Sequence, residues 1–463
     1  MERLNPNFNT DYEEFLCEYV LPLLGIDVVT NRALFDRTTH HAEKTETILQ
    51  ENGCLSFYIS GWHVLSVPCS MRIPEDDLAV CRRILQSFPD IAQYKMTGMG
   101  RHLPSAFPYD MQKQALYRTA IQNGISRWLA GDHKNNNIDQ LFNELETWAV
   151  KTYEGKTVTM GFIINPEAES DFGIGKQKWL QFMRDDTAAM LTDCIHSVIE
   201  LDPKCNFVEY HSLSDQNYIP GCELSYKAPL RFLQMIQTHV TDKKRGVFLL
   251  NNGDIVLAKE QEIRFVRRNL RWLNFSYRAF RNSLDSFVLE AQKEKSVSTE
   301  QLESLLENVF ASVLDVSFSH AGGIIAVVGG EWVGSVAVQE SEEVPILASS
   351  DDLLNPEYDR EDHTEDFRAL KRCVIKELVK EKSFGEMDRK LRGELLGLDG
   401  ACILTYDGRV QSFGAIIQND KGSDGGGRSA AAKKLSQYGM SVKISTDGYI
   451  EVYTGKKLVY SIK

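Results

Sequence analysis

The fold of the C-terminal part of this chain is decided by Leu398-Asp399-Gly400-Ala401-Cys402-Ile403-Leu404, an apolar run preceded by an acidic residue. Residues 401–404 predict a buried strand, residues 406–409 the turn of a hairpin, and residues 410–417 the returning strand. Asp399 is therefore expected at the beginning of a buried strand. Because Asp in this position often only caps a turn, a second motif is needed before a site is indicated.

The second motif, Gly425-Gly426-Gly427-Arg428, follows the hairpin and leads into a helical pattern. Glycines let the backbone turn its N–H groups toward an anion, and the positive end of a helix beginning near Ser429 would point the same way. A guanidinium at Arg428 supplies a fork for phosphate. The two motifs together indicate a nucleotide site.

Residues 296–463 resemble the catalytic domain of the diadenylate cyclases, which condense two ATP molecules into cyclic di-AMP. The family's Asp-Gly-Ala signature matches Asp399, Gly400 and Ala401, and its Gly-Thr-Arg-His-Arg-Ala-Ala signature is imitated by residues 426–432. Residues 321–328 look like the first core strand of the family. The resemblance implies a mixed β-sheet flanked by helices for this part of the chain.

The departures from the family bear on activity. The resemblance implies that Asp399 helps to hold a metal and to activate the attacking ribose hydroxyl, whereas Arg428 holds the triphosphate. Ser429 and Ala430 replace the His and second Arg of the family's turn, and Asp447 lies one position from the place of a second metal-binding carboxylate. Because phosphoryl transfer depends on positioning and charge neutralisation, these losses should lower the rate steeply while binding persists.

The sequence therefore favours a regulatory protein that senses ATP or a cyclic dinucleotide. Mg²⁺ or Mn²⁺ is expected with a bound triphosphate, at Asp399 and Asp447. The alternative is an active diadenylate cyclase, in which Asp399 is catalytic. Family enzymes face two ATP-loaded domains together, so both functions allow a homo-oligomer and only the enzyme requires one. The nucleotide-binding residues expected are Asp399, Gly400, Ala401, Gly426, Gly427, Arg428 and Ser429.

Composition limits the classes of protein to which this chain can belong. The 463 residues exceed one ordinary core, and 43% hydrophobic with 25% charged residues is typical of a soluble globular protein. Residues 1–6 show no export pattern and no apolar run approaches the ~20 residues of a membrane span, so we expect a cytoplasmic protein without a membrane partner. A formal net charge of −13 argues against broad nucleic-acid binding.

We expect an α/β protein of three segments. Residues 1–200 form an α/β domain of no legible role, residues 201–295 a strand-rich middle segment with a connecting helix, and residues 296–463 the cyclase-like domain with an acidic insertion at 339–366. Apolar residues at helical spacing predict a helix over 177–199.

Two similar stretches raise an internal repeat. Leu249-Leu250-Asn251-Asn252-Gly253-Asp254-Ile255 and Leu404-Thr405-Tyr406-Asp407-Gly408-Arg409-Val410 are alike enough to suggest that the middle segment is a degenerate copy of the nucleotide domain. Chance convergence of hairpin motifs is the alternative. The basic cluster at 243–271 is either a solvated face or a clamp for phosphates or an acidic partner.

Overall fold

The computed structural model describes residues 13–26, 48–94, 109–169, 178–213, 219–329, 374–417 and 426–462, apart from gaps at 52, 60–61, 70–71, 132, 134–135, 220, 222–224, 294–296, 376 and 380–381. The acidic insertion expected at 339–366 lies outside these residues. The chain divides into two compact units. The first comprises Met1–Ile219 and Gln234–Phe275, and the second Pro220–Leu233 and Ser276–Lys463.

The first unit begins with a helical segment, a small sheet and three helices. The helical segment contains η1 (Leu16–Val20) and α2 (Leu21–Leu23). The small antiparallel sheet has the order β1 (Ile48–Glu51), β2 (Cys54–Ile59) and β3 (Trp62–Pro68). The three helices are α3 (Glu75–Tyr94), α4 (Tyr109–Leu129) and α5 (Ile138–Ala149).

A seven-stranded sheet in the order β12-β11-β10-β9-β6-β7-β8 is the centre of the first unit. Its strands are β6 (Met160–Ile164), β7 (Ser197–Leu201), β8 (Phe207–Ser212), β9 (Arg245–Leu249), β10 (Ile255–Lys259), β11 (Glu262–Arg268) and β12 (Arg271–Asn274). The elements between them are α6 (Lys178–Phe182), η3 (Asp186–Met190) and α7 (Leu230–His239), and β4 (Thr152–Tyr153) pairs with β5 (Lys156–Thr157).

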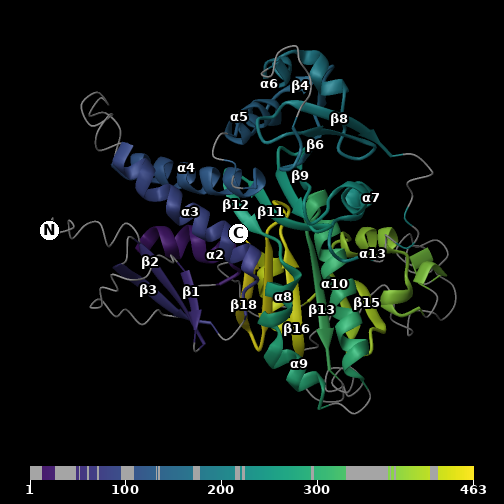
Figure 1. Cartoon of the computed structure of the whole chain (residues 1–463). Coiled ribbons are helices and arrows are strands. Elements are labelled where there is room, and N and C mark those ends of the chain that lie inside the picture. Colours follow the sequence, from purple (N-terminus) through teal and green to yellow (C-terminus); the bar gives the residue numbers. More distant parts are fainter. Residues whose placement is uncertain are drawn as a thin grey trace, which may run out of the picture. The chain divides into compact units, whose positions relative to one another are not determined.

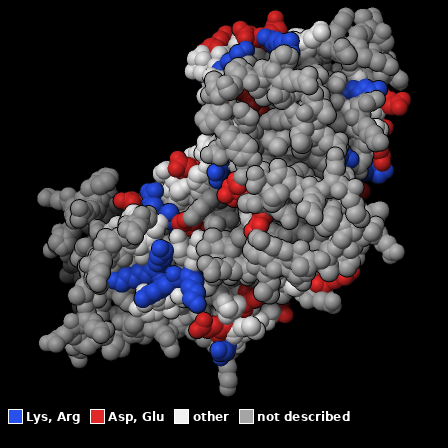
Figure 2. Space-filling model, turned by 90° about the vertical axis from the view of Figure 1, so that its left-hand side faces the viewer, with Lys and Arg blue, Asp and Glu red and all other residues white. Residues whose placement is uncertain are grey.

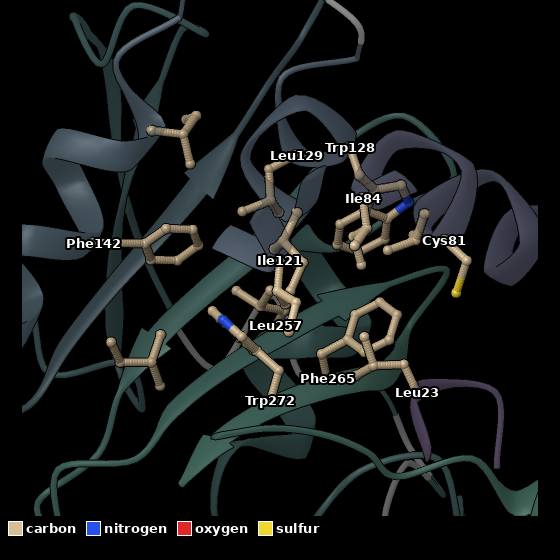
Figure 3. Close-up of a cluster of buried hydrophobic side chains, with 14 of the residues drawn as sticks. Leu23, Cys81, Ile84, Ile121, Trp128, Leu129, Phe142, Leu257, Phe265 and Trp272 are labelled. Carbon is tan, nitrogen blue, oxygen red and sulfur yellow. The ribbon is translucent and has the colours of Figure 1, made fainter. Parts of the chain in front are cut away.

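Aromatic side chains connect helices α4 and α5 to one face of this sheet (Figure 3). The rings of Trp128 and Phe265 meet edge to face with centroids 5.6 Å apart, and those of Phe142 and Trp272 do so at 5.4 Å. All four side chains are buried. Such pairs add to the free energy of burying large apolar surfaces, so this face forms the main core of the unit.

The second unit contains a six-stranded mixed sheet in the order β15-β14-β13-β16-β17-β18 (Figure 1). Its strands are β13 (Gly323–Val328), β14 (Ala401–Thr405), β15 (Val410–Ala415), β16 (Gly439–Ile444), β17 (Ile450–Thr454) and β18 (Lys457–Ile462). Its helices are α8 (Tyr277–Ser283), α9 (Asp285–Ala291), α10 (Thr299–Ser319), the 3-10 turn η8 (Phe384–Glu386), α13 (Arg389–Leu396) and α14 (Gly426–Leu435).

Helices cover both faces of the six-stranded sheet. Successive residues of a strand point to opposite faces of the sheet. The two glycines at the start of β13 therefore show which helix covers each face. A Cβ on Gly322 would meet Arg428 of α14, whereas one on Gly323 would meet Leu396 of α13. The second unit is therefore an α/β layer structure in which β13 and β14 are interior strands of one sheet, as the sequence predicted, and they pair in parallel.

Two expectations about segments are corrected. Residues 177–199 do not form one helix: α6 and η3 are short, and the segment ends in β7. Its apolar spacing fitted a helix, but Val198 and Ile199 gain pairing partners on two neighbouring strands instead. The expected boundary at residue 200 is also wrong, because it cuts β7 and separates strands of one seven-stranded sheet.

The two sheets share one topology. In each, a central strand pairs in parallel with the next long strand of the chain and antiparallel with the strand that follows a helix. These pairs are β6 with β7 and β9 in the first unit, and β13 with β14 and β16 in the second. A hairpin partner, β8 or β15, forms one edge, and further antiparallel strands extend the other.

The correspondence extends to single residues in β9, β10 and β11 of the first unit and β16, β17 and β18 of the second. Equivalent residues lie 195 positions apart, as Ile255 and Ile450 do. The β10–β11 and β17–β18 hairpins shift register at the same place, after Leu257 and Val452. Both close on two residues of positive φ, which are Glu260 and Gln261 in one hairpin and Gly455 and Lys456 in the other.

The structural alignment of the two sheets does not match the two sequence stretches that suggested a repeat. The stretch at Leu249 spans the β9–β10 turn, whose equivalent is the β16–β17 turn, and not the β14–β15 turn at Leu404. In both equivalent turns a glycine of positive φ, Gly253 or Gly448, donates its N–H to a carbonyl oxygen at 2.9 Å. Tight turns favour the same few residue types wherever they occur. The two stretches are therefore alike in sequence although they belong to hairpins that are not equivalent in the two sheets.

Gly400 is the position in the second unit where a side chain should be least tolerated. Its φ is +102°, and a Cβ there would lie 2.4 Å from the carbonyl carbon of Gly414. Gly400→Ala should therefore lower the free energy of unfolding by about 2–5 kcal/mol, through strain and overpacking. Urea denaturation followed by circular dichroism measures this loss.

Gly427→Ala is the matched control, since a Cβ at Gly427 would meet no atom within 4 Å and the residue is helical. It should leave stability unchanged or raise it by up to ~1 kcal/mol. Equal midpoints for the two variants would contradict the close approach of β14 and β15.

Candidate functional site

The beginnings of β13 and β14 lie at one end of the six-stranded sheet. The strands are parallel, with Ile324 opposite Ala401. Gly322 lies two residues before Ile324, and Asp399 lies two residues before Ala401 in the bend that leads into β14, so both come to this end of the sheet.

Arg428 comes to the same place from the first turn of α14. A Cβ on Gly322 would be 2.2 Å from Nη1 of Arg428, so the guanidinium lies directly against the glycine backbone. Arg428 and Asp399 are both exposed. Within the described residues neither side chain has an ion pair or hydrogen bond, which leaves the guanidinium donors and the carboxylate oxygens available to a ligand.

Glycines keep the beginning of α14 open. The helix starts at Gly426, three residues before the expected Ser429, because Gly426 has a φ of +79° and turns the chain into the helix. Gly426 and Gly427 are exposed, and a Cβ on either would meet nothing within 4 Å. The backbone N–H groups of a first helical turn have no partner inside the helix, so this turn suits an anion.

Three of the expected residues have other roles. Ala401 is 1% exposed and packs in the core of the α14 face, so its side chain offers a ligand nothing. Gly400 permits the close approach of β15. Ser429 is 3% exposed, and its hydroxyl accepts a hydrogen bond from Lys443 Nζ at 2.7 Å.

Lys443, Glu451 and Tyr453 extend this contact into a polar network that the sequence had not singled out. Lys443 Nζ also donates to Glu451 Oε2 at 2.8 Å, and the Tyr453 hydroxyl donates to the same oxygen at 2.9 Å. Burial, followed by its bond to Glu451, raises the pKa of Tyr453. A detectable signal was the polar alternation of β16 and β17 on a face that a helix must cover.

Asp447 lies at the same end of the sheet, exposed in the turn between β16 and β17. Strand β13 separates β16 from β14, so Asp447 and Asp399 are not on neighbouring strands. In the described part of the chain, one group of three potential metal ligands converges, and it contains neither residue. The expected pair could hold a cation only together with ligand oxygens.

The convergent group is Glu200, Glu209 and His211 in the first unit. Glu200 is 2% exposed and accepts hydrogen bonds of 2.7 Å from His211, Lys244 and Asn165. Burial alone would raise the pKa of Glu200, but these three bonds outweigh it and lower the pKa to about 2. Lys244 already neutralises the carboxylate, so the group is an internal ion-pair network.

The basic cluster at 243–271 is largely engaged in ion pairs. Arg264 contacts Asp77 at 2.6 Å, Arg268 contacts Asp254 at 2.8 Å, and Arg267 pairs with Glu146. On the face drawn in Figure 2, several basic side chains lie beside acidic ones, and one larger basic patch stands at the lower left of the view. Arg264, Arg267 and Arg268 hold the first unit together and do not form a phosphate clamp.

Comparison of the sequence with protein-family models gave no match, and comparison with curated proteins gave none either. None of the helices in the described part of the chain combines the length and the apolar composition needed to cross a bilayer. The assignment of a function therefore depends on the geometry of the site.

Glu200 should make the stability of the first unit depend on pH in acid. Its folded pKa of about 2 lies below its ordinary value of 4.5, so its contribution is complete above pH 4.5 and is lost as pH falls toward 2. Glu200→Gln should cost roughly 3 kcal/mol at pH 7 and flatten this acid limb. Urea unfolding at a series of pH values measures both effects.

The exposed cross-strand neighbour Glu209 provides the control, because Glu209→Gln should change stability by less than about 0.5 kcal/mol. If the two variants have the same acid limb, Glu200 is not the group responsible.

Proposed function

We propose that the second unit binds a phosphate-bearing nucleotide, ATP or a cyclic dinucleotide, where β13 and β14 begin, and that the chain acts as a nucleotide sensor. The observation that carries this proposal is the guanidinium of Arg428, which is exposed, has no ion pair or hydrogen bond among the described residues, and lies against the bare backbone of Gly322 at the end of the sheet where Asp399 precedes β14. An arginine in this state has its full set of donors for a phosphate.

The local electrostatics favour an anion. The positive end of α14 and the Arg428 guanidinium lie at the same end of the sheet, and the exposed Gly426 and Gly427 place no side chain over the first turn of the helix. Asp399 is the residue that would face a Mg²⁺ or Mn²⁺ ion carried in with a triphosphate. Such a sensor would act in the cytoplasm, where these nucleotides occur, and its ligand could also join two copies of the chain.

Binding is favoured over synthesis of cyclic di-AMP because the site has few positive charges. Ala430 carries none, and Ser429 is buried with its hydroxyl bonded to Lys443. Phosphoryl transfer requires neutralisation of charge spread over several phosphate oxygens, whereas binding needs only part of that. An active cyclase remains the competing function, and turnover decides between the two.

Arg428→Ala should weaken nucleotide binding by about 1.5–3 kcal/mol, roughly ten- to more than hundredfold, because a charge-assisted fork is lost. Calorimetric titration of ATP and of cyclic di-AMP measures the effect. Arg409→Ala is the control: Arg409 is 73% exposed and pairs with Asp407 at the opposite end of β14. Unchanged affinity in Arg428→Ala, or no binding by the wild type, would remove the basis of the proposal.

Incubation of the purified protein with ATP and Mg²⁺ or Mn²⁺ should produce little or no cyclic di-AMP at neutral pH, as judged by chromatography. The reason is the loss of two phosphate contacts at Ser429 and Ala430. Robust turnover that disappears in Asp399→Asn would establish the enzyme and exclude a pure sensor.

A further inference from the structure

The shared topology of the two sheets provides a comparison within one chain. The polar network of the second unit consists of Ser429, Lys443, Glu451 and Tyr453. At a constant offset of 195 residues, the equivalents of the last three are Phe248, Val256 and Ala258, all fully buried. The same fold thus fills these positions with apolar side chains in one unit and with a lysine, a glutamate and a tyrosine in the other.

This contrast means that the network is not a requirement of the fold. A buried ion pair loses hydration energy, and apolar residues of similar size commonly pack at least as stably. The first unit contains such an apolar solution on the equivalent face. A polar network kept where the fold works without one points to a role in binding.

The Lys443 ammonium has one N–H group that is not used by its two hydrogen bonds. Its ammonium carries three N–H groups, of which one is given to Ser429 and one to Glu451. The third has no partner among the residues that the structure describes. The side chain is 17% exposed, so the ammonium is enclosed but not sealed from solvent.

Lys443 also stands next to the proposed site. It pairs with Ile324 on β13 and therefore points to the same face as Gly322, two residues earlier, which Arg428 covers. Two residues along a strand span on the order of 7 Å. The second unit thus presents two cations on one face, one exposed at the end of the sheet and one a step further in.

Resting on the proposed function, we propose that Lys443 is a second phosphate-binding residue of this site, positioned by Glu451 and Ser429. Two cations on one face of the sheet, at successive positions along it, favour a ligand with at least two phosphate groups. The site would therefore discriminate nucleoside di- and triphosphates and cyclic dinucleotides from monophosphates. The equivalent of Lys443 in the first unit is the buried Phe248, so this second cation belongs to the second unit alone.

The test is calorimetric titration of the full-length chain with AMP, ADP, ATP and cyclic di-AMP. The wild type should bind the best ligand with two or more phosphates at least tenfold more tightly than AMP. Lys443→Met should lose at least tenfold in affinity for that ligand and less than threefold for AMP. Lys443→Arg, which keeps the charge, should retain most of the discrimination, whereas Arg428→Ala should weaken every ligand.

A second variant guards against misfolding. Lys443→Met leaves Glu451 buried without its cation, so Lys443→Met combined with Glu451→Gln removes both charges and keeps an acceptor for Tyr453. Circular dichroism and the thermal midpoint report folding. A folded double variant with reduced discrimination supports the inference.

The outcomes separate the two proposals. Wild-type discrimination in the folded double variant, or AMP bound as tightly as ATP by the wild type, overturns the role of Lys443 and leaves the proposed function standing on Arg428. If none of the four ligands binds the wild type, both proposals fail together.

Discussion

The parallel pairing of β13 with β14 is the constraint on which the site of the second unit depends. Parallel strands begin at the same end of a sheet, so Gly322 and Asp399, which are 77 positions apart in the chain, both come to that end. Helix α14 must then return over this face before β16 can pair with the other side of β13. Arg428 is brought to Gly322 by that return, and only a residue without a side chain leaves room for its guanidinium.

The two units separate what this topology requires from what it leaves free. The topology requires a turn glycine (Gly253 or Gly448), and a hairpin (β10–β11 or β17–β18) with a register shift and a two-residue turn of positive φ. Both units have all three features. The topology leaves free the composition of the face under the helix that precedes β9 or β16. At that face the first unit has Phe248 and the second has Lys443. The side chain at this position therefore differs in polarity between two units that share one backbone topology.

Elements with strong local signals were predictable from the sequence, and residues defined by long-range contacts were not. The hairpins and the interior strands β13 and β14 were expected because apolar runs bounded by turn residues specify strands locally. The helix expected over 177–199 was wrong, because strand pairing overrode a spacing that suited a helix. Gly322 was quoted only as part of a strand, since its contact with Arg428 joins residues 106 positions apart. Lys443 was missed for the same reason, as its partners come from α14 and β17.

The charges of the second unit explain why binding and chemistry can separate. Lys443 is already balanced by Glu451, so the network adds no net charge, and a phosphate can share the ammonium without displacing its partners. Arg428 is exposed and has no acidic partner among the described residues, which suits the first encounter with an anion. One free and one shared cation are enough to hold two phosphates. They provide less positive charge than a transition state distributed over several phosphate oxygens demands. Under the proposed function, an arrangement of this kind would recognise a polyphosphate while contributing little to its reaction.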